Sequence, residues 1–409
     1  MRQAGRRWSG DSGSGGTGFG GTGSGGTGSG GAGSGGTPSL GGWGRSGPAS
    51  APPQGVLGWI WIRLAALLIV IVVLVATAGL LLGHADGGPV AADARSTGHD
   101  ALWMGHAWLE GRRSPADLRL LASRIRGSGI SDVYLFAGGL DSAGRLAPAG
   151  YARAGTFLAS FRSACPGVRV SAWLGGVTGP GHINLDDPAT RSRILAADAA
   201  VLRAGFRGVH YDLGPVTSGD TGLLALLSAT RALHPDPLSV AVPKLEPLPS
   251  LRLPAQLVTR RPVFWTPGYL TQVAGLVGQV VVLSYDTGMP FQSWYGGYVE
   301  RETSLALRAV PRRAALLIGV PAYHNSDLGH HADAETVAAA IHGIRVAVTA
   351  ARESRDRANG GGRGEGGAGA GGAGGFGVAL FADCTATAQD WTSYLQDWVR
   401  PGSGTTRGG

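Results

Sequence analysis

Lysine and cysteine are scarce in this chain of 409 residues. Lys244 is the single lysine among 35 basic residues, and Cys165 and Cys384 are the two cysteines. In an external domain the two cysteines could pair. Charged residues make up 15% of the chain and form no basic run interleaved with aromatic residues, so the net charge of +8 does not indicate a nucleic-acid partner.

Apolar residues are nearly missing from positions 9 to 50, which consist mostly of Gly, Ser and Thr in an approximate repeat. Such a composition buries too little apolar surface to offset the entropy of ordering. We therefore expect residues 1–55 to form a disordered tail, and residues 403–409 a second one.

An uncharged apolar run covers residues 64–83, which is long enough for the hydrocarbon core of a bilayer. We expect a transmembrane helix over residues 56–83, followed by a linker over residues 84–100. Arginines precede the run and acidic residues follow it, so the positive-inside rule places the tail in the cytoplasm and the remainder outside the cell membrane. The Ala92-Asp93-Ala94 segment leaves cleavage as a signal peptide open as the alternative.

From residue 101 onward, short apolar segments alternate with segments of helical periodicity. The expected strands are 101–109, 132–136, 169–174, 208–213, 238–243, 279–285, 314–320 and 377–381. Eight such repeats over about 300 residues predict an α/β protein of the (β/α)8 (TIM) barrel class, covering residues 101–402 with a Gly-rich loop insertion at 359–375. A doubly wound open sheet is the alternative. The barrel places Cys165 and Cys384 at opposite ends, so we expect no disulfide.

The loops after the strands carry function in such a barrel. Aromatic and polar side chains gather at these strand ends, a mixture that suits sugar rings and their hydroxyl groups. The candidates for substrate binding are His106, Trp108, Trp173, His210, Tyr211, Lys244, Tyr323 and Asp383, and the candidates for catalysis are Asp212, Glu246, Tyr285 and Asp286. Asp141 and Asp220 also lie near this rim, with no role assigned.

The segment Gly208-Val209-His210-Tyr211-Asp212-Leu213-Gly214 resembles the fourth-strand signature of family 18 glycoside hydrolases, the chitinase-like barrels. Asp212 matches the Asp next to the catalytic acid, whereas Arg207 and His210 replace two earlier Asp residues. Val282-Leu283-Ser284-Tyr285-Asp286 is similar to the Met-x-Tyr-Asp motif of the sixth strand in that family.

The resemblance implies a mechanism in which the acetamido oxygen of the substrate attacks the anomeric carbon. An Asp and a Tyr orient that amide, roles that Asp212 and Tyr285 match. A Glu protonates the leaving oxygen, but Gly214 occupies its position. General acid catalysis contributes about 10²–10⁴-fold, so its loss without a substitute predicts a nearly inactive site.

Other residues could replace the missing acid. Glu246 and Asp286 follow neighbouring strands and could form a carboxyl pair, or they could simply form ion pairs at the rim. Lys244 is interpreted as an ion-pair partner of Asp212 or Glu246, as a Schiff-base lysine, or as a chance occurrence. Trp108, Trp173, Trp265 and Trp294 are either stacking platforms or packing residues.

His324, Asp327, His330 and His331 follow the seventh strand, and a metal site is one interpretation of them. Their spacing favours a solvated loop instead, so we predict no metal and no cofactor. The leading hypothesis is a membrane-anchored external barrel that acts on or binds a glycan, such as an N-acetylated cell-wall polysaccharide. The alternatives are a catalytically inactive glycan-binding or scaffold barrel and, less favoured, a lyase that uses Lys244.

Overall fold

The computed structural model describes residues 54–234, 237–246, 264–327, 329–358 and 375–402. The predictions for the N-terminal tail, for most of the 359–375 insertion and for the tail after residue 402 therefore concern residues outside these ranges. The described chain divides into the N-terminal part of a long apolar helix and a barrel unit that begins at Gly79.

The apolar helix, α2, spans Gln54–Asp86. Its segment Trp61–Asp86 has a mean hydropathy of 3.0, and by length and composition it could cross a membrane. Most of the large apolar side chains that the described residues expose lie on this helix, among them Ile69 and Leu74. A helix that is apolar all round has its natural surroundings in lipid or in a protein core.

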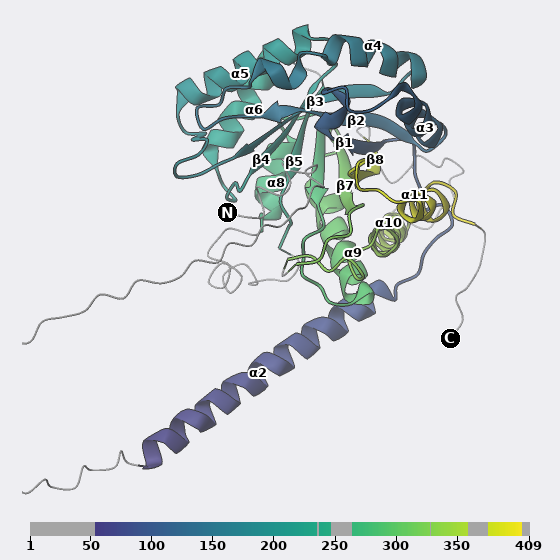
Figure 1. The fold of residues 1–409 in the computed structure, drawn as a ribbon. Coiled ribbons are helices and arrows are strands. Elements are labelled where there is room, and N and C mark those ends of the chain that lie inside the picture. The colour runs from purple at the N-terminus through teal and green to yellow at the C-terminus, as the bar shows by residue number, and fades with distance from the viewer. Residues whose placement is uncertain (1–53, 235–236, 247–263, 328, 359–374, 403–409) are drawn as a thin grey trace, which may run out of the picture. The chain divides into compact units, whose positions relative to one another are not determined.

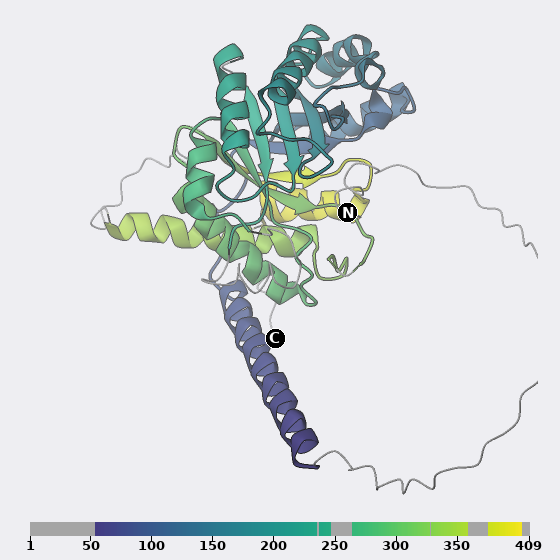
Figure 2. The same ribbon diagram turned by 90° about the vertical axis from the view of Figure 1, so that its left-hand side faces the viewer.

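Eight parallel strands close into a barrel in sequence order, and the helices lie outside them (Figures 1 and 2). The fold prediction is thus confirmed, and the open-sheet alternative is excluded because β1 pairs with β8. The strands are β1 (Asp100–Met104), β2 (Ile130–Gly139), β3 (Arg169–Val177), β4 (Val209–Gly214), β5 (Leu238–Val242), β6 (Gln279–Leu283), β7 (Ala315–Pro321) and β8 (Phe376–Phe381).

The helices follow the strands, as a barrel of this class requires. They are α3 (Pro115–Ile125), α4 (Ala154–Ala164), α5 (Pro188–Arg203), α6 (Thr221–Leu233), α8 (Pro267–Ala274), α9 (Gln292–Ala309), α10 (Val337–Ala358) and α11 (Ala388–Ser393). Two short 3-10 helices, η1 (His106–Trp108) and η2 (Pro148–Tyr151), and the π-helix η3 (Tyr394–Val399) accompany them. Ser114 and Asp187 cap α3 and α5 by accepting hydrogen bonds from backbone N–H groups of the first turn. The first strand is shorter than predicted, because the chain turns into η1 after Gly105.

Asp100 links the first strand of the barrel to the last strand. Its buried carboxylate accepts hydrogen bonds from the Val378 backbone on β8 and from the side chains of Ser96, Tyr394 and Trp398. Burial raises the pKa of Asp100 to about 6 despite these bonds. One carboxyl group thus links the first strand to the last strand and to the C-terminal helix η3.

The segment between α2 and β1, predicted as a linker, lies against α10. Arg345 on α10 donates to the backbone oxygens of Ala91 and Ala94, and Thr349 accepts from the Ala91 N–H. Ala94 is fully buried. Around the end of α2, a Cβ added to Gly297 would lie 1.9 Å from the Leu82 carbonyl oxygen, so only glycine permits this close approach. Cys165 and Cys384 form no disulfide, as expected.

Candidate functional site at the C-terminal mouth of the barrel

Successive side chains of β4 point to opposite faces, which separates the predicted site residues into two groups. Tyr211 faces outward, where its hydroxyl donates to Asp198 on α5 and lies 2.8 Å from Thr230 on α6. It is completely buried between the strand and these helices. The prediction that Tyr211 contacts a substrate is therefore wrong, and the opposite face of the strand carries His210, Asp212 and Gly214.

His210 lies inside the barrel, below Asp212. Its ring stacks on Tyr134 with centroids 3.7 Å apart, and Nδ1 lies 2.8 Å from the Ser239 hydroxyl oxygen. It has no exposed surface, and burial lowers its pKa to about 3. Neutral His210 is thus part of the interior packing, which places it out of reach of a substrate and contradicts the predicted binding role.

A continuous set of aromatic rings lines the mouth. Tyr285 packs against Phe381 and Tyr323 with centroids 5.5 and 5.8 Å apart, Trp173 contacts Phe381 at 5.9 Å, and Phe136 contacts Trp173 at 4.8 Å. The rings come from β2, β3, β8 and the segments that follow β6 and β7. Phe136, Tyr323 and Phe381 are half-buried, whereas Trp173 and Tyr285 lie beneath them with 4% and 1% of their surface exposed.

The partly exposed rings are not those that the sequence suggested. Trp173 is too deeply buried to act as a stacking platform. Trp265 is also buried, and its indole N–H donates to the Val216 carbonyl. Phe136 and Phe381, which the prediction omitted, are the final residues of two expected strands, and that position was the signal that could have identified them.

Trp108 and Asp383 bind each other. The indole N–H donates to Asp383 Oδ2 at 2.7 Å, and the Gly105 N–H donates to Oδ1 at 2.9 Å. Burial raises the pKa of Asp383, and these hydrogen bonds oppose that effect. The pair joins the segments after β1 and β8, so both residues already have structural partners. His106 lies at the rim beside Phe136, 5.9 Å between centroids, and within 3.6 Å of Glu110.

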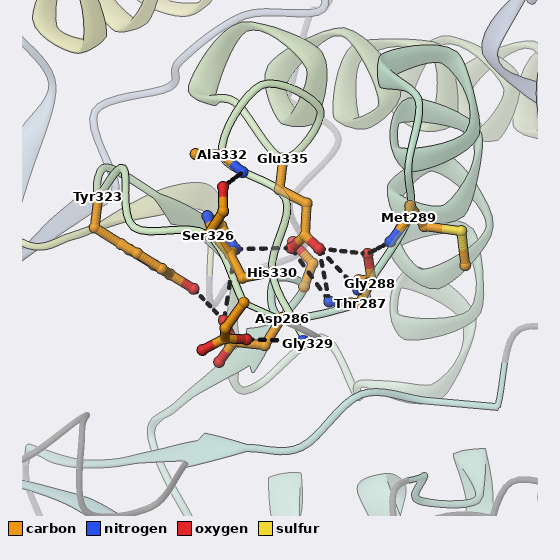
Figure 3. A network of polar contacts seen from close by, with 12 residues as sticks. Asp286, Thr287, Gly288, Met289, Tyr323, Ser326, Gly329, His330, Ala332 and Glu335 are labelled. Carbon is orange, nitrogen blue, oxygen red and sulfur yellow. Dashed lines mark hydrogen bonds and ion pairs between the residues drawn. The ribbon is translucent and has the colours of Figure 1, made fainter. Parts of the chain in front are cut away.

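Asp286 lies in the segment just after β6, in a dense polar network (Figure 3). Its backbone has φ +57°, a left-handed conformation that a non-glycine residue rarely adopts. The Tyr323 hydroxyl donates to Asp286 Oδ1, and His330 Nδ1 lies 3.6 Å from the same oxygen. Burial, and then the nearby Asp286 carboxylate, raise the pKa of Tyr323, so this hydroxyl remains protonated and can donate.

The loop after β7 is only partly solvated, contrary to the prediction. His330 is 2% exposed and Glu335 is 1% exposed. His324 fits the expectation better, because it is about half exposed, and its Nε2 lies 2.8 Å from Asp390, which helps to cap α11.

Lys244 and Glu246 follow β5. The buried Glu302 of α9 accepts a hydrogen bond from the Leu245 N–H and feels the charge of Lys244. Burial raises the pKa of Glu302 to about 8, and the hydrogen bond and Lys244 counter this. Glu302 is therefore an acidic residue near Lys244 that the sequence did not reveal. The Glu246 N–H donates to the Trp265 carbonyl, and its side chain is half-buried at this strand end.

Gly214 lies at the end of β4, two residues beyond Asp212 and on the same face. A Cβ built at Gly214 would have no atom within 4 Å, apart from its chain neighbours. The position therefore has room for a side chain. Asp141 and Asp220, by contrast, serve local structure, since Asp141 holds its own turn and Asp220 caps α6.

Comparisons with known proteins identify no family. No protein-family model matches the chain, and neither does any curated protein. Among solved structures, the chain is similar to the spore cortex-lytic enzyme SleL of Bacillus cereus, with 11% identity, 74% of this chain and 75% of that chain covered, and a TM-score of 0.48.

Two other similar structures are a chitinase from Bacteroides thetaiotaomicron and the C-terminal domain of a putative chitinase from Desulfitobacterium hafniense DCB-2. The first is 11% identical, the match covers 77% of this chain and 99% of that chain, and the TM-score is 0.48. The second is 12% identical, the match covers 73% of this chain and 98% of that chain, and the TM-score is 0.49. Likeness at this level concerns the fold alone.

Proposed function

We propose that this protein is a membrane-anchored, extracytoplasmic barrel that binds a glycan, such as an N-acetylated cell-wall polysaccharide, at the C-terminal mouth. The observation that carries this proposal is the lining of the mouth. The rings of Phe136, Tyr323 and Phe381 are half-buried there, and Tyr323 packs near Phe381 and donates a hydrogen bond to Asp286. Asp212 lies on the inner face of β4. Aromatic faces suit the apolar faces of pyranose rings, and carboxylates suit their hydroxyl groups.

The absence of a side chain at Gly214 favours binding over hydrolysis. The resemblance of β4 to the chitinase-like signature puts the proton donor at this position, where the structure has open space. A site without a general acid loses about 10²–10⁴-fold in rate. The bilayer anchor and the outward orientation are supported by α2 and by the arginines that precede its apolar run.

Binding is tested by isothermal titration of the full chain in detergent micelles with N-acetylglucosamine hexamer. Replacing Phe381 by Ala removes a half-buried ring from the mouth, so we expect about tenfold weaker binding. Phe291→Ala, which removes an exposed ring before α9, is the matched control and should bind normally. Equal affinity of the two variants would contradict a site at the mouth.

The second candidate is a hydrolase in which Glu246 donates the proton. It is favoured by the half-buried position of Glu246 at the neighbouring strand end. Hydrolysis of a chromogenic N-acetylglucosamine dimer by the full chain, abolished in Glu246→Gln, would select this candidate. The lyase alternative depends on Lys244, and reductive trapping of a substrate on this lysine with borohydride would reveal it.

A further inference from the structure

The turn after β6 is held by a buried carboxylate from another loop. Glu335 Oε1 accepts hydrogen bonds from the Thr287 N–H at 3.0 Å, the Gly288 N–H at 2.8 Å and the Thr287 hydroxyl at 3.0 Å. Figure 3 shows these contacts converging on Glu335. Because the turn follows Asp286 directly, Glu335 stabilises the left-handed backbone conformation that directs the Asp286 side chain.

His330 connects Glu335 to Asp286. Its Nδ1 lies 3.2 Å from Glu335 Oε2 and 3.6 Å from Asp286 Oδ1. Carboxylate oxygens only accept hydrogen bonds, so Nδ1 carries the hydrogen. The imidazole also stacks on Tyr323 with centroids 4.3 Å apart, and Tyr323 donates to the same Asp286 oxygen. The ring is therefore fixed both by its edge and by its face.

Both contacts reach one oxygen of Asp286. Oδ2 accepts no hydrogen bond from the described residues, and 26% of the Asp286 side chain is exposed. A partly exposed carboxylate with one oxygen bound by the protein can accept a hydrogen bond from a ligand hydroxyl at its other oxygen. Its orientation is determined before a ligand arrives, which lowers the entropic cost of binding.

We propose that Glu335 and His330 are positioning residues that hold Asp286 so that Oδ2 accepts a hydroxyl group of the glycan. This inference rests on the proposed function. Glu335 and His330 need not touch the ligand, because they act through Asp286. Loss of either one should therefore matter only while the Asp286 carboxylate is present.

A double-mutant cycle tests this dependence. Isothermal titration with N-acetylglucosamine hexamer compares the full-length wild type, Asp286→Asn, Glu335→Gln and the double variant. We expect each single change to weaken binding about tenfold or more, as for the loss of a hydrogen bond to a charged group. The double variant should bind no more weakly than Asp286→Asn alone. Two effects that multiply would overturn the proposal.

Two further variants separate positioning from general damage. Glu353→Gln, an exposed change on α10, should bind like the wild type. His330→Gln enters the same cycle in place of Glu335→Gln if the latter does not fold, with the same expected and contrary outcomes.

A wild type that binds no hexamer would overturn both the proposed function and the ligand assigned to Oδ2. The positioning is judged separately by NMR of 15N-labelled histidine. The His330 Nδ1 signal should shift in Glu335→Gln and also in Asp286→Asn, since both carboxylates face that nitrogen. An unchanged His330 signal in Asp286→Asn would contradict the link between His330 and Asp286.

Discussion

Replacing Gly214 by Glu should introduce a proton donor at the position where the family 18 signature has its catalytic Glu. The built Cβ meets no atom within 4 Å, and the glycine has no positive φ, so the backbone accepts a larger residue. Asp212 and residue 214 lie on the same face of β4, at a separation of about 6.6 Å along the strand. A carboxyl group at 214 would therefore project above Asp212 into the mouth.

The expected gain is that of general acid catalysis, about a hundredfold to ten-thousandfold in turnover. The assay is the release of 4-methylumbelliferone from an N-acetylglucosamine dimer by the full chain in detergent micelles. Gly214→Gln has nearly the same shape but no dissociable proton, so it should stay at the wild-type rate. Adding Asp212→Asn to Gly214→Glu should remove most of the gain, because Asp212 would no longer orient the acetamido group.

A folded Gly214→Glu variant with an unchanged melting temperature and no more turnover than Gly214→Gln would refute the reasoning. Asp212 and Tyr285 would then not be arranged for acetamido-assisted hydrolysis. The mouth would then have to be interpreted as a binding surface, and not as a hydrolase site that lacks its acid.

Two further predictions concern stability. Burial raises the pKa of Asp198 to about 7 from 3.8, so the native state favours the protonated form. The contribution of Asp198 to the free energy of unfolding is fully present below about pH 4 and is lost as the pH rises to 7. The loss is about 4 kcal/mol at most. In Asp198→Asn, the free energy of unfolding measured by chemical denaturation should depend less on pH in this range, and an unchanged slope would contradict the assignment. The effect of His210 is the same in the wild type and in the variant, so it cancels in the comparison. Gly297→Ala places a methyl group against the backbone at the end of α2 and should cost about 1–3 kcal/mol. Gly268→Ala, in open space on α8, should leave the melting temperature unchanged, and equal behaviour of both alanine variants would argue against the close contact.

The barrel could be predicted from the sequence because its signal is local. Each of the eight strands is a short apolar segment followed by a helical segment, and some of these helices begin at a capping residue, as at Ser114 and Asp187. These patterns repeat often enough that errors at single ends do not change the topology. The end of β1 was misjudged, because the apolar residues of η1 continue the strand pattern beyond Gly105.

The site was harder to predict because it depends on pairs that are distant in sequence. Tyr211 looked like a mouth residue because it neighbours Asp212, but alternation along β4 turns it toward Asp198. Nothing near Glu335 in the sequence indicates that it holds a turn about fifty residues earlier. Likewise, Asp383 meets Trp108 and Glu302 lies near Lys244 only because the barrel brings distant segments together.

The attachment of the segment around Ala94 to α10 has a consequence for proteolytic release. Ala92 and Asp93 are exposed, but Ala94 is buried, its carbonyl is bound by Arg345, and Asp93 pairs with Arg352. A protease requires an extended, accessible peptide. Processing after Ala94 would therefore have to precede folding of the barrel, and once α10 is in place the chain would be shed only if this segment first detached.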